Sequence, residues 1–246
     1  IIDIQENIYA YDINETLIYV FKNIQSNKDR LFIHIKKIVD EYNNISNNVV
    51  NRKPTNIDEA KTSKESYYYW IRNKFNNIDD KKSIESSALF MFINKTCFRG
   101  LFREGPNGFN VPYGHYKNTS NIITLHEINT ISDLIKNVNF IHSDFKDSIN
   151  KVKTGDFVYL DPPYAPENEN SFVGYTNDGF NYDKHIELFN SIHDMTNKNI
   201  KFLMSNANVP LVLDNFIDFN LLQITARRAI NAKKPGSTTT EVLIYN

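Results

Sequence analysis

The tetrapeptide Asp161-Pro162-Pro163-Tyr164 carries the groups that can bind and activate an amine on a flat heterocycle. The Asp161 carboxylate and a proline carbonyl can accept both amino hydrogens, and the Tyr164 ring can stack on the heterocycle. Such an amine is a poor nucleophile because its lone pair is delocalised into the ring. Accepting its hydrogens favours a pyramidal nitrogen, whose lone pair can attack an electrophilic methyl group. An ordinary Pro-rich turn with Asp161 as its acceptor is the alternative, and the tetrapeptide alone leaves both open.

The stretch before this tetrapeptide, residues 156–160, is short, apolar and rich in β-forming residues, which predicts a buried parallel strand. Pro162 and Pro163 prevent further strand pairing and fix an extended, rigid loop after it. Open α/β sheets place their chemistry at the carboxyl ends of such strands. The order of these residues therefore favours a site at this loop.

Length and composition limit the fold and the location. A chain of 246 residues that is 41% hydrophobic can bury a sizeable core, in one large domain or two modest ones. Its single cysteine, Cys97, excludes a disulfide framework and a thiolate metal cluster and predicts a reducing compartment, the cytoplasm. No apolar run approaches the roughly 20 residues of a membrane span, so no membrane partner is expected. The formal charge of −1 means that any nucleic-acid surface is local.

The first strand is predicted over residues 8–11 and ends at Asp12. A helix follows, because Ile13, Leu17 and Phe21 lie at helical spacing. Asp12 and Glu15 resemble a capping box, which would make Asp12 the cap of this helix. An acid at the end of the second strand of a nucleotide-binding fold can instead bind ribose hydroxyls. The local sequence favours the cap.

Residues 27–120 differ from the rest of the chain because they show helical spacing without alternating strands. Helices are predicted around residues 31–42, 67–75 and 84–91. We interpret this region as a helical domain inserted between the strands of another domain.

A hairpin is predicted at the end of the inserted region, where Asn107-Gly108 separates two apolar stretches. The segment 98–117 carries Arg99, Arg103, His115 and Lys117 among aromatic residues and prolines. This mixture is typical of a loop that enters a DNA groove, where arginine can bind guanine through two hydrogen bonds. A solvated hairpin whose arginines only maintain solubility has the same composition, so both interpretations stay open.

The alternation of strands and helices resumes after residue 120. Strands are predicted over residues 138–142, 200–204, 219–225 and 241–245, with a helix around 186–192. Between the last two strands lie Arg227-Arg228 and Lys233-Lys234-Pro235-Gly236, which suit contacts with phosphate. A charge run of this kind is more often a solvated face, so the loop supports a DNA contact only weakly.

Together these stretches resemble the Dam-type DNA adenine-N6 methyltransferases, an alpha-class family that recognises GATC. The resemblance runs from about residue 8 to the end, in the order of the family. The stretches that carry it are Asn110-Val111-Pro112-Tyr113-Gly114 in the hairpin, Asp161-Pro162-Pro163-Tyr164, Phe172-Val173-Gly174-Tyr175-Thr176, Met204-Ser205-Asn206, Arg227-Arg228-Ala229-Ile230-Asn231 and Glu241-Val242-Leu243.

The resemblance implies an α/β fold, the Rossmann-like sheet of class I methyltransferases with an inserted helical and β-hairpin recognition domain. Residues 1–26 and 121–246 would form the catalytic domain and residues 27–120 the recognition domain. The implied cofactor is S-adenosylmethionine, the implied partner is double-stranded DNA, and no metal is expected. The target adenine would be flipped out of the duplex into the pocket, as chemistry on a stacked base requires.

The resemblance also implies a role for each group of residues. In the pocket, Asp161 and Pro162 would hold the adenine amino group, and Pro163 and Tyr164 would complete the catalytic loop. Cofactor contacts would come from Asp12, Ile13, Asp144, Phe145 and Asp161, with Asp12 on the ribose, which replaces the capping interpretation. On the DNA, Phe98 would wedge into the duplex, and Leu101, Arg103, Pro112 and Tyr116 would read bases. Further DNA contacts are expected from Arg99, Lys117, Arg227, Lys233 and Lys234.

One part of the family pattern has no counterpart in these residues. The family's glycine-rich Phe-x-Gly-x-Gly turn, which holds the methionine part of the cofactor, does not occur before Asp12. We therefore expect a missing segment or a second chain to supply it, and the alternative is a catalytically silent DNA-binding or regulatory subunit on the same scaffold. Arg99 stands where a polar amide is expected, and the link from Arg103 to Pro112 is short, so the expected site is GATC or a related sequence.

Overall fold

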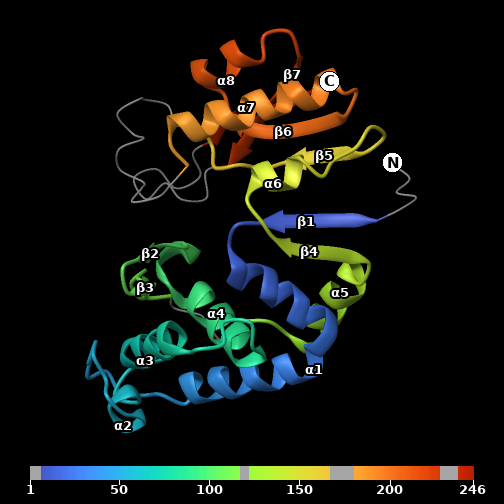
Figure 1. Cartoon of the computed structure of the whole chain (residues 1–246). Helices are drawn as coiled ribbons and strands as arrows, with labels where there is room; N and C mark the ends of the chain where they lie inside the picture. The colour runs from blue at the N-terminus through green and yellow to red at the C-terminus, as the bar shows by residue number, and fades with distance from the viewer. Residues whose placement is uncertain (1–6, 117–121, 167–179, 228–237) are drawn as a thin grey trace. The chain divides into compact units, whose positions relative to one another are not determined.

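The computed structural model describes residues 7–116, 122–166, 180–227 and 238–246, and the chain divides into two compact units (Figure 1). The first unit spans Ile1–Ser143 and the second Asp144–Asn246. Each unit combines helices with a pair of parallel strands, so the predicted mixed α/β class is confirmed. The predicted domains, residues 1–26 with 121–246 and residues 27–120, do not coincide with these units and stay a prediction.

The strands of the first unit are β1 (Ile8–Asp12) and β4 (Val138–His142), which pair in parallel with Asp12 opposite His142. Both strands confirm the sequence-based prediction. The side chain of Gln25 donates hydrogen bonds to the carbonyl oxygens of Ile135 at 2.6 Å and Val138 at 2.8 Å. These bonds tie the following helix, α1 (Glu15–Asn43), to the start of β4.

Helix α1 joins two helices that were predicted separately around residues 13–24 and 31–42. Asn27 has non-helical backbone angles (φ −139°, ψ 25°) and marks a kink where the prediction placed a break. The helix continues across the predicted domain boundary at residue 26. It packs against α4 (Ile84–Thr96) of the predicted recognition domain and against α5 (Leu125–Ile135) and β4 of the predicted catalytic domain. A single helix therefore serves both predicted domains.

Asp12 is not the cap of α1, which corrects the interpretation based on the local sequence. Asn14 has an extended backbone and is the N-cap, because its side chain accepts the N–H of Leu17 at 3.0 Å. Asp12 instead accepts the N–H of Asn14 at 2.6 Å through Oδ1. The helix begins two residues later than the Asp12–Glu15 capping box requires, so Glu15 is its first residue and cannot complete that box.

The remaining helices of the first unit begin at polar caps. Asn56 caps α2 (Ile57–Ala60), Ser63 caps α3 (Lys64–Asn77) and Ser83 caps α4. Helix α5 was not predicted, although Thr124 and Glu127 form a complete capping box at its start. In the core of this unit, Phe92 meets the rings of Tyr42 and Tyr67 edge-on. Among the described residues, no helix has both the length and the apolar character needed to cross a membrane.

The predicted hairpin is present as β2 (Glu104–Gly105) and β3 (Gly108–Phe109), which pair antiparallel across Pro106-Asn107. Gly108 has a positive φ of 84°, a conformation that L side chains rarely adopt. A short 3-10 turn, η1 (Phe98–Gly100), connects α4 to the hairpin. The prediction of a hairpin at Asn107-Gly108 is confirmed.

The second unit contains a four-stranded sheet in the order β5 (Phe157–Leu160), β6 (Lys201–Ala207), β8 (Thr238–Tyr245) and β7 (Asn220–Arg227). The pair β5–β6 is parallel, and the other two pairs are antiparallel. Helix α7 (Tyr182–Asn197) packs on β6, and α6 (Phe145–Ile149) packs on α7 (Figure 1). Residues from α7, from α8 (Pro210–Asn215) and from β6 and β8 form the core of this unit.

Strand β5 is parallel to β6, as predicted, but the prediction that it is buried is wrong. The side chains of Phe157 and Tyr159 are 47% and 58% exposed, while Val158 and Leu160 are half-buried. Among the described residues β5 pairs only with β6 and is an edge of its sheet. The strand therefore has one half-buried and one exposed face. Because the residues on both faces are apolar, the sequence shows no apolar–polar alternation that would have predicted the exposed face.

Candidate functional site

The Asp161 loop begins where β5 ends, as predicted, and the neighbouring strand supplies a partner for its carboxylate. Leu160 pairs with Met204, so Asp161 and Ser205 follow at the same level on adjacent parallel strands. The Ser205 hydroxyl donates a hydrogen bond to Oδ1 of Asp161 at 2.6 Å. Asp161 itself is exposed. A short bond to an ionised acceptor is strong, so Ser205 fixes the orientation of an accessible carboxylate.

The far end of the same loop is held by Asn206, which is fully buried. Its Oδ1 accepts the N–H of Ala165 at 2.9 Å and the N–H of Ala207 at 2.8 Å. The buried Nδ2 of this side chain has no hydrogen-bond partner within the described ranges. Ser205 and Asn206 thus hold the loop at both ends. Both residues belong to the stretches that carry the family resemblance, but no role was predicted for them.

Tyr164 lies between these two anchors and is 39% exposed. Its hydroxyl donates to Oε2 of Glu241 on β8 at 3.3 Å. Partial burial, with the charges of Glu241 and Asp161 nearby, raises the pKa of Tyr164 above its usual value. The side chain is therefore a neutral phenol with part of its ring open to solvent.

The predicted cofactor residues of the first unit lie at the end of β1. Asp12 is half-buried, and its main-chain carbonyl accepts the N–H of Ser143 at 3.1 Å, beyond the end of β4. Ile13, the next residue, is 67% exposed. An anchored carboxylate beside an open apolar side chain is a combination that suits a nucleoside.

The predicted cofactor residues of the second unit lie at the start of α6. Asp144 is the N-cap of this helix and accepts the N–H of Lys146 at 2.9 Å. The Phe145 ring meets the Phe180 ring at 5.6 Å and lies beneath the Lys184 ammonium group, also at 5.6 Å. Asp144 therefore has a structural role as a cap, and Phe145 is part of a small aromatic and cationic cluster.

The hairpin region presents several large side chains to solvent. Phe98, Leu101 and Tyr116 are 42%, 39% and 40% exposed, and Pro112 is also exposed. Arg99 has a positive φ of 59°, which is uncommon outside glycine, and its guanidinium lies 4.9 Å from the centre of the Phe98 ring. These predicted DNA-contacting residues share one unit with Arg103.

Helix α3 holds residues 109–113, a segment that begins at the end of β3. Asn76 binds Phe109 twice, because its Nδ2 donates to the carbonyl at 3.0 Å and its Oδ1 accepts the N–H at 2.9 Å. Tyr68 and Arg72 both donate to the carbonyl of Val111, at 2.7 Å and 3.0 Å. These three α3 residues are spaced by four and lie on one helix face. The sequence-based prediction missed all three.

This anchoring decides which residues of the segment face outwards. Phe109, Val111 and Tyr113 are buried, and the Tyr113 hydroxyl is hydrogen-bonded to that of Tyr42. Asn110 and Pro112 are exposed because side chains alternate along an extended chain. The segment is thus an extended stretch fixed by its backbone, with Asn110 and Pro112 on its exposed side.

Cys97 lies beneath the same segment and is fully buried. It forms an isolated antiparallel bridge with Tyr113, and Phe98 donates its N–H to the Pro112 carbonyl at 2.8 Å. Burial raises the pKa of the Cys97 thiol to about 11. The thiol is therefore protonated and unreactive while residues 109–113 cover it.

Some of the predicted DNA contacts belong to stretches that the structure does not describe. Lys117, Lys233 and Lys234 lie outside the described residues, as does the stretch 172–176 that contributed to the family resemblance. Arg227 ends strand β7, and its backbone pairs with Thr238. Their proposed contacts stay predictions.

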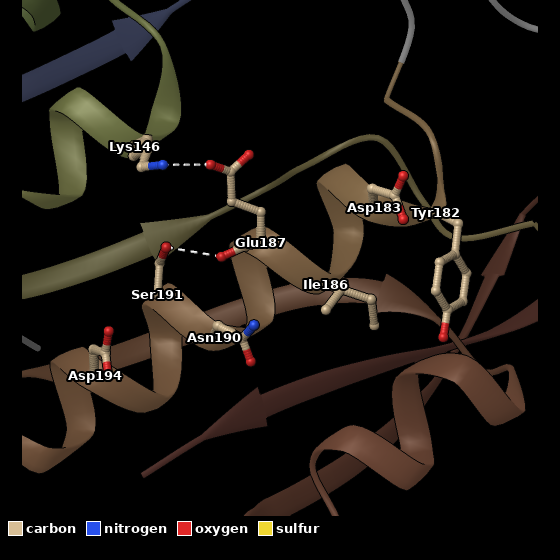
Figure 2. Close-up of a pocket in the computed structure, with 8 residues that line it drawn as sticks. All are labelled: Lys146, Tyr182, Asp183, Ile186, Glu187, Asn190, Ser191 and Asp194. Atoms are coloured by element: carbon tan, nitrogen blue, oxygen red, sulfur yellow. Dashed lines mark hydrogen bonds and ion pairs between the residues drawn. The ribbon is translucent and has the colours of Figure 1, made fainter.

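A surface depression of about 560 Å³ lies in the second unit, over α7 (Figure 2). Glu187 accepts hydrogen bonds from Lys146 at 2.6 Å and Lys184 at 2.7 Å, which lower the pKa of its carboxyl to about 2. Figure 2 also shows Ser191 donating to the Glu187 carbonyl oxygen, at 2.8 Å. None of the predicted catalytic or cofactor residues lines this depression, whose walls are Lys146, Tyr182, Asp183, Ile186, Glu187, Asn190, Ser191 and Asp194.

Comparison with known proteins identifies the family of the chain. Residues 3–230 match the family described as the D12 class N6 adenine-specific DNA methyltransferases. Type II methyltransferase M.MjaIII of Methanocaldococcus jannaschii is 35% identical over 247 residues, which cover 98% of this chain and 80% of that protein. Type II methyltransferase M1.LlaDCHI of Lactococcus lactis is 34% identical over 195 residues, which cover 76% of this chain and 68% of that protein. The DNA adenine methylase of Escherichia coli (strain K12) is 26% identical, with coverage of 91% and 76%.

The family match extends over most of the chain, and M.MjaIII is more than 30% identical over nearly all of it. The prediction of an adenine-specific DNA methyltransferase is thereby confirmed. The chain belongs to the D12 class of N6 adenine-specific DNA methyltransferases.

Proposed function

We propose that this enzyme transfers a methyl group from S-adenosylmethionine to the amino nitrogen of an adenine flipped out of double-stranded DNA, with Asp161-Pro162-Pro163-Tyr164 as the catalytic loop. The observation that carries the proposal is the exposed Asp161 carboxylate at the end of β5, oriented by the Ser205 hydroxyl at 2.6 Å. One carboxylate oxygen is engaged by Ser205. The other has no contact among the described residues and can accept a hydrogen of the adenine amine.

In this proposal the loop changes the electronic character of the amine. Asp161 accepts one amino hydrogen and the Pro162 carbonyl the other, which favours a pyramidal nitrogen with a localised lone pair. The exposed part of the Tyr164 ring stacks on the adenine. When bound, S-adenosylmethionine supplies an electrophilic methyl group on a sulfonium sulfur. The nitrogen then sheds one proton, for which the Asp161 carboxylate is the adjacent acceptor.

The residues present fit the nucleoside part of this cofactor. Ribose hydroxyls need an anchored acceptor, and the half-buried Asp12 carboxylate at the end of β1 supplies one. The 67% exposed Ile13 offers an apolar surface for the adenine, and Asp144 and Phe145 offer an acceptor and a ring. We assign these residues to cofactor binding on that chemistry.

The proposed architecture is the Rossmann-like sheet of class I methyltransferases, with residues 1–26 and 121–246 as catalytic domain and 27–120 as recognition domain. The parallel pairs β1–β4 and β5–β6 support it, because both place chemically active residues after the carboxyl end of a strand. The buried, lone Cys97 supports the cytoplasm as the location.

A methyl-transfer assay distinguishes this enzyme from a catalytically silent subunit. The chain is incubated with S-adenosylmethionine labelled in the methyl group and with DNA duplexes, alone and with any segment encoded upstream. We expect label on the adenine amino group of duplex DNA. Specific DNA binding without transfer under both conditions would instead support the silent subunit.

Tyr164 tests the stacking part of the proposal. Tyr164→Ala should lower kcat/KM by roughly 5- to 150-fold, because stacking of a base on an aromatic ring contributes about 1–3 kcal/mol. Tyr164→Phe is the matched control: it keeps the ring and loses only the hydroxyl, with its 3.3 Å bond to Glu241 and its interaction with Ser205, so activity should stay near that of the unaltered enzyme. Equal losses in both variants would assign the role of Tyr164 to its hydroxyl.

Arg103 tests the reading of DNA sequence, which we propose to be GATC or a related site. Arg103→Ala should relax discrimination at one G·C pair by about 1–3 kcal/mol, the contribution of a two-hydrogen-bond contact to guanine. The measurement compares methylation rates on the cognate duplex and on duplexes with each base pair changed in turn. Arg30→Ala, which removes another exposed arginine of the same unit, is the control.

A loss that is equal on every duplex would show that Arg103 contacts a phosphate. That pattern is expected for Lys233→Ala, which should weaken binding to all sequences alike and reduce its dependence on salt. The two variants therefore separate base contacts from backbone contacts.

A further inference from the structure

We propose that Asn110 is a positioning residue for sequence recognition, which holds the guanidinium of Arg103 in one orientation, and that Gly105 leaves the space its side chain needs. The inference rests on the proposed role of Arg103 as the residue that contacts a base. It adds a requirement that the family resemblance did not assign.

Three hydrogen bonds join residues 103 and 110. Nε of Arg103 donates to Oδ1 of Asn110 at 2.6 Å, and Nη2 donates to the Asn110 main-chain oxygen at 3.4 Å. In the reverse direction, the Asn110 N–H donates to the Arg103 carbonyl at 3.0 Å. Both the backbone and the side chain of Arg103 are thus held by one residue.

Among the described residues, Asn110 alone forms hydrogen bonds to this guanidinium, so its terminal edge is available to a base. Guanidinium has five N–H donors in a rigid plane, and Asn110 engages the edge formed by Nε and Nη2. The terminal edge, formed by the two Nη groups, keeps a pair of parallel donors, which matches the O6 and N7 acceptors of guanine. Because an unrestrained arginine has many rotamers, this restraint reduces the freedom that binding would otherwise remove.

Asn110 can act in this way because its own backbone is fixed on both sides. Asn76 binds the N–H and the carbonyl of Phe109, and Tyr68 and Arg72 bind the carbonyl of Val111. The two neighbours of Asn110 are each 1% exposed, so Asn110 faces outwards from a segment whose neighbouring side chains are buried. The chain of contacts runs from α3 through the segment 109–111 to the guanidinium.

Gly105 provides an independent test of the same geometry. A Cβ at position 105 would lie 2.6 Å from Nδ2 of Asn110, closer than nonbonded atoms approach. The atom in the way is the end of a side chain, so Gly105→Ala would displace the Asn110 amide without forcing the backbone to move. It should therefore reproduce the effect of Asn110→Ala from a different position.

The experiment is a double-mutant cycle read out as discrimination. Rates of methylation are measured on the duplex preferred by the unaltered enzyme and on duplexes with one base pair changed, for Arg103→Ala, Asn110→Ala and the double variant. We expect Asn110→Ala to reduce discrimination about 3- to 10-fold at the same base pair as Arg103→Ala. In the Arg103→Ala background, Asn110→Ala should change discrimination no further.

Two further variants separate positioning from a general structural effect. Asn110→Asp keeps an acceptor for Nε, so discrimination should be retained while its negative charge weakens binding to all duplexes alike. Gly105→Ala should lose discrimination as Asn110→Ala does. Circular dichroism and Trp70 fluorescence check that each variant is folded.

Each outcome has a distinct meaning. Unchanged discrimination in Asn110→Ala, or an equal loss with and without Arg103, would overturn the positioning role while leaving Arg103 as the reader. If Arg103→Ala itself leaves discrimination unchanged, the proposed role of Arg103 fails and the inference fails with it.

Discussion

Asp161→Ala should reduce methyl transfer by roughly 10²–10⁴-fold, the range for loss of a positioned acid or base. The variant removes the acceptor that localises the lone pair of the amine and the adjacent acceptor for its proton. The fold should be preserved, because Asp161 is exposed and its side chain forms one hydrogen bond within the described part of the chain, to the Ser205 hydroxyl. The measurement is single-turnover transfer of labelled methyl to duplex DNA, together with DNA affinity and thermal unfolding.

Asp194→Ala is the matched control for this prediction, since it removes an exposed carboxylate of the same unit that lies on α7. We expect activity close to that of the unaltered enzyme. Turnover of Asp161→Ala within a few fold of the control would remove Asp161 from the catalytic loop. A parallel loss of DNA affinity and of thermal stability would mean that the residue is needed for the fold.

Leu31→Ala should lower the free energy of unfolding by about 2–5 kcal/mol, the range for truncating a buried leucine. Leu31 lies on α1 at 0% exposure in the core of the first unit, where the aromatic residues of α3 and α4 meet. The cavity left there cannot be filled by solvent without exposing apolar surface. Denaturation in guanidinium, followed by fluorescence of the single Trp70 that packs on the same core, measures the change.

Ile33→Ala provides the comparison from the same helix, because Ile33 is 65% exposed. Its substitution should change the free energy of unfolding by no more than about 0.5 kcal/mol. Similar shifts in both variants would contradict the assignment of Leu31 to the core. A normal transition for Leu31→Ala in Trp70 fluorescence would do the same.

The elements with a strong local pattern could be predicted from the sequence. Strands β1, β4, β6, β7 and β8 have short apolar runs, and Asn107-Gly108 has a strong turn preference, so the residues themselves specify these structures. The chemistry of Asp161 could also be predicted because its groups are adjacent in the chain. The predictions that were wrong depended on neighbouring residues. Asn14, and not Asp12, is the N-cap of α1, and α1 continues past Asn27, where two separate helices were predicted.

The supporting residues of the site could not be predicted, because they are far apart in sequence from what they hold. Ser205 reaches Asp161 only through the register of β5 with β6. Asn76 reaches Phe109 only when α3 packs against the segment after the hairpin. Neither relation leaves a local pattern in the residues. The exposure of Tyr159 likewise depends on strand order, which an apolar run does not encode.

The position of Cys97 allows local opening of residues 109–113 to be measured as a rate. The thiol is covered by the segment and has a pKa raised by burial to about 11, so a thiol reagent can modify it only when that cover detaches. Because the chain has no other cysteine, the labelling rate of the native protein reports the frequency of this one local opening. DNA bound to Asn110 and Pro112 would keep this segment in place over Cys97. The labelling rate of the thiol would then fall on binding and recover only when the DNA dissociates.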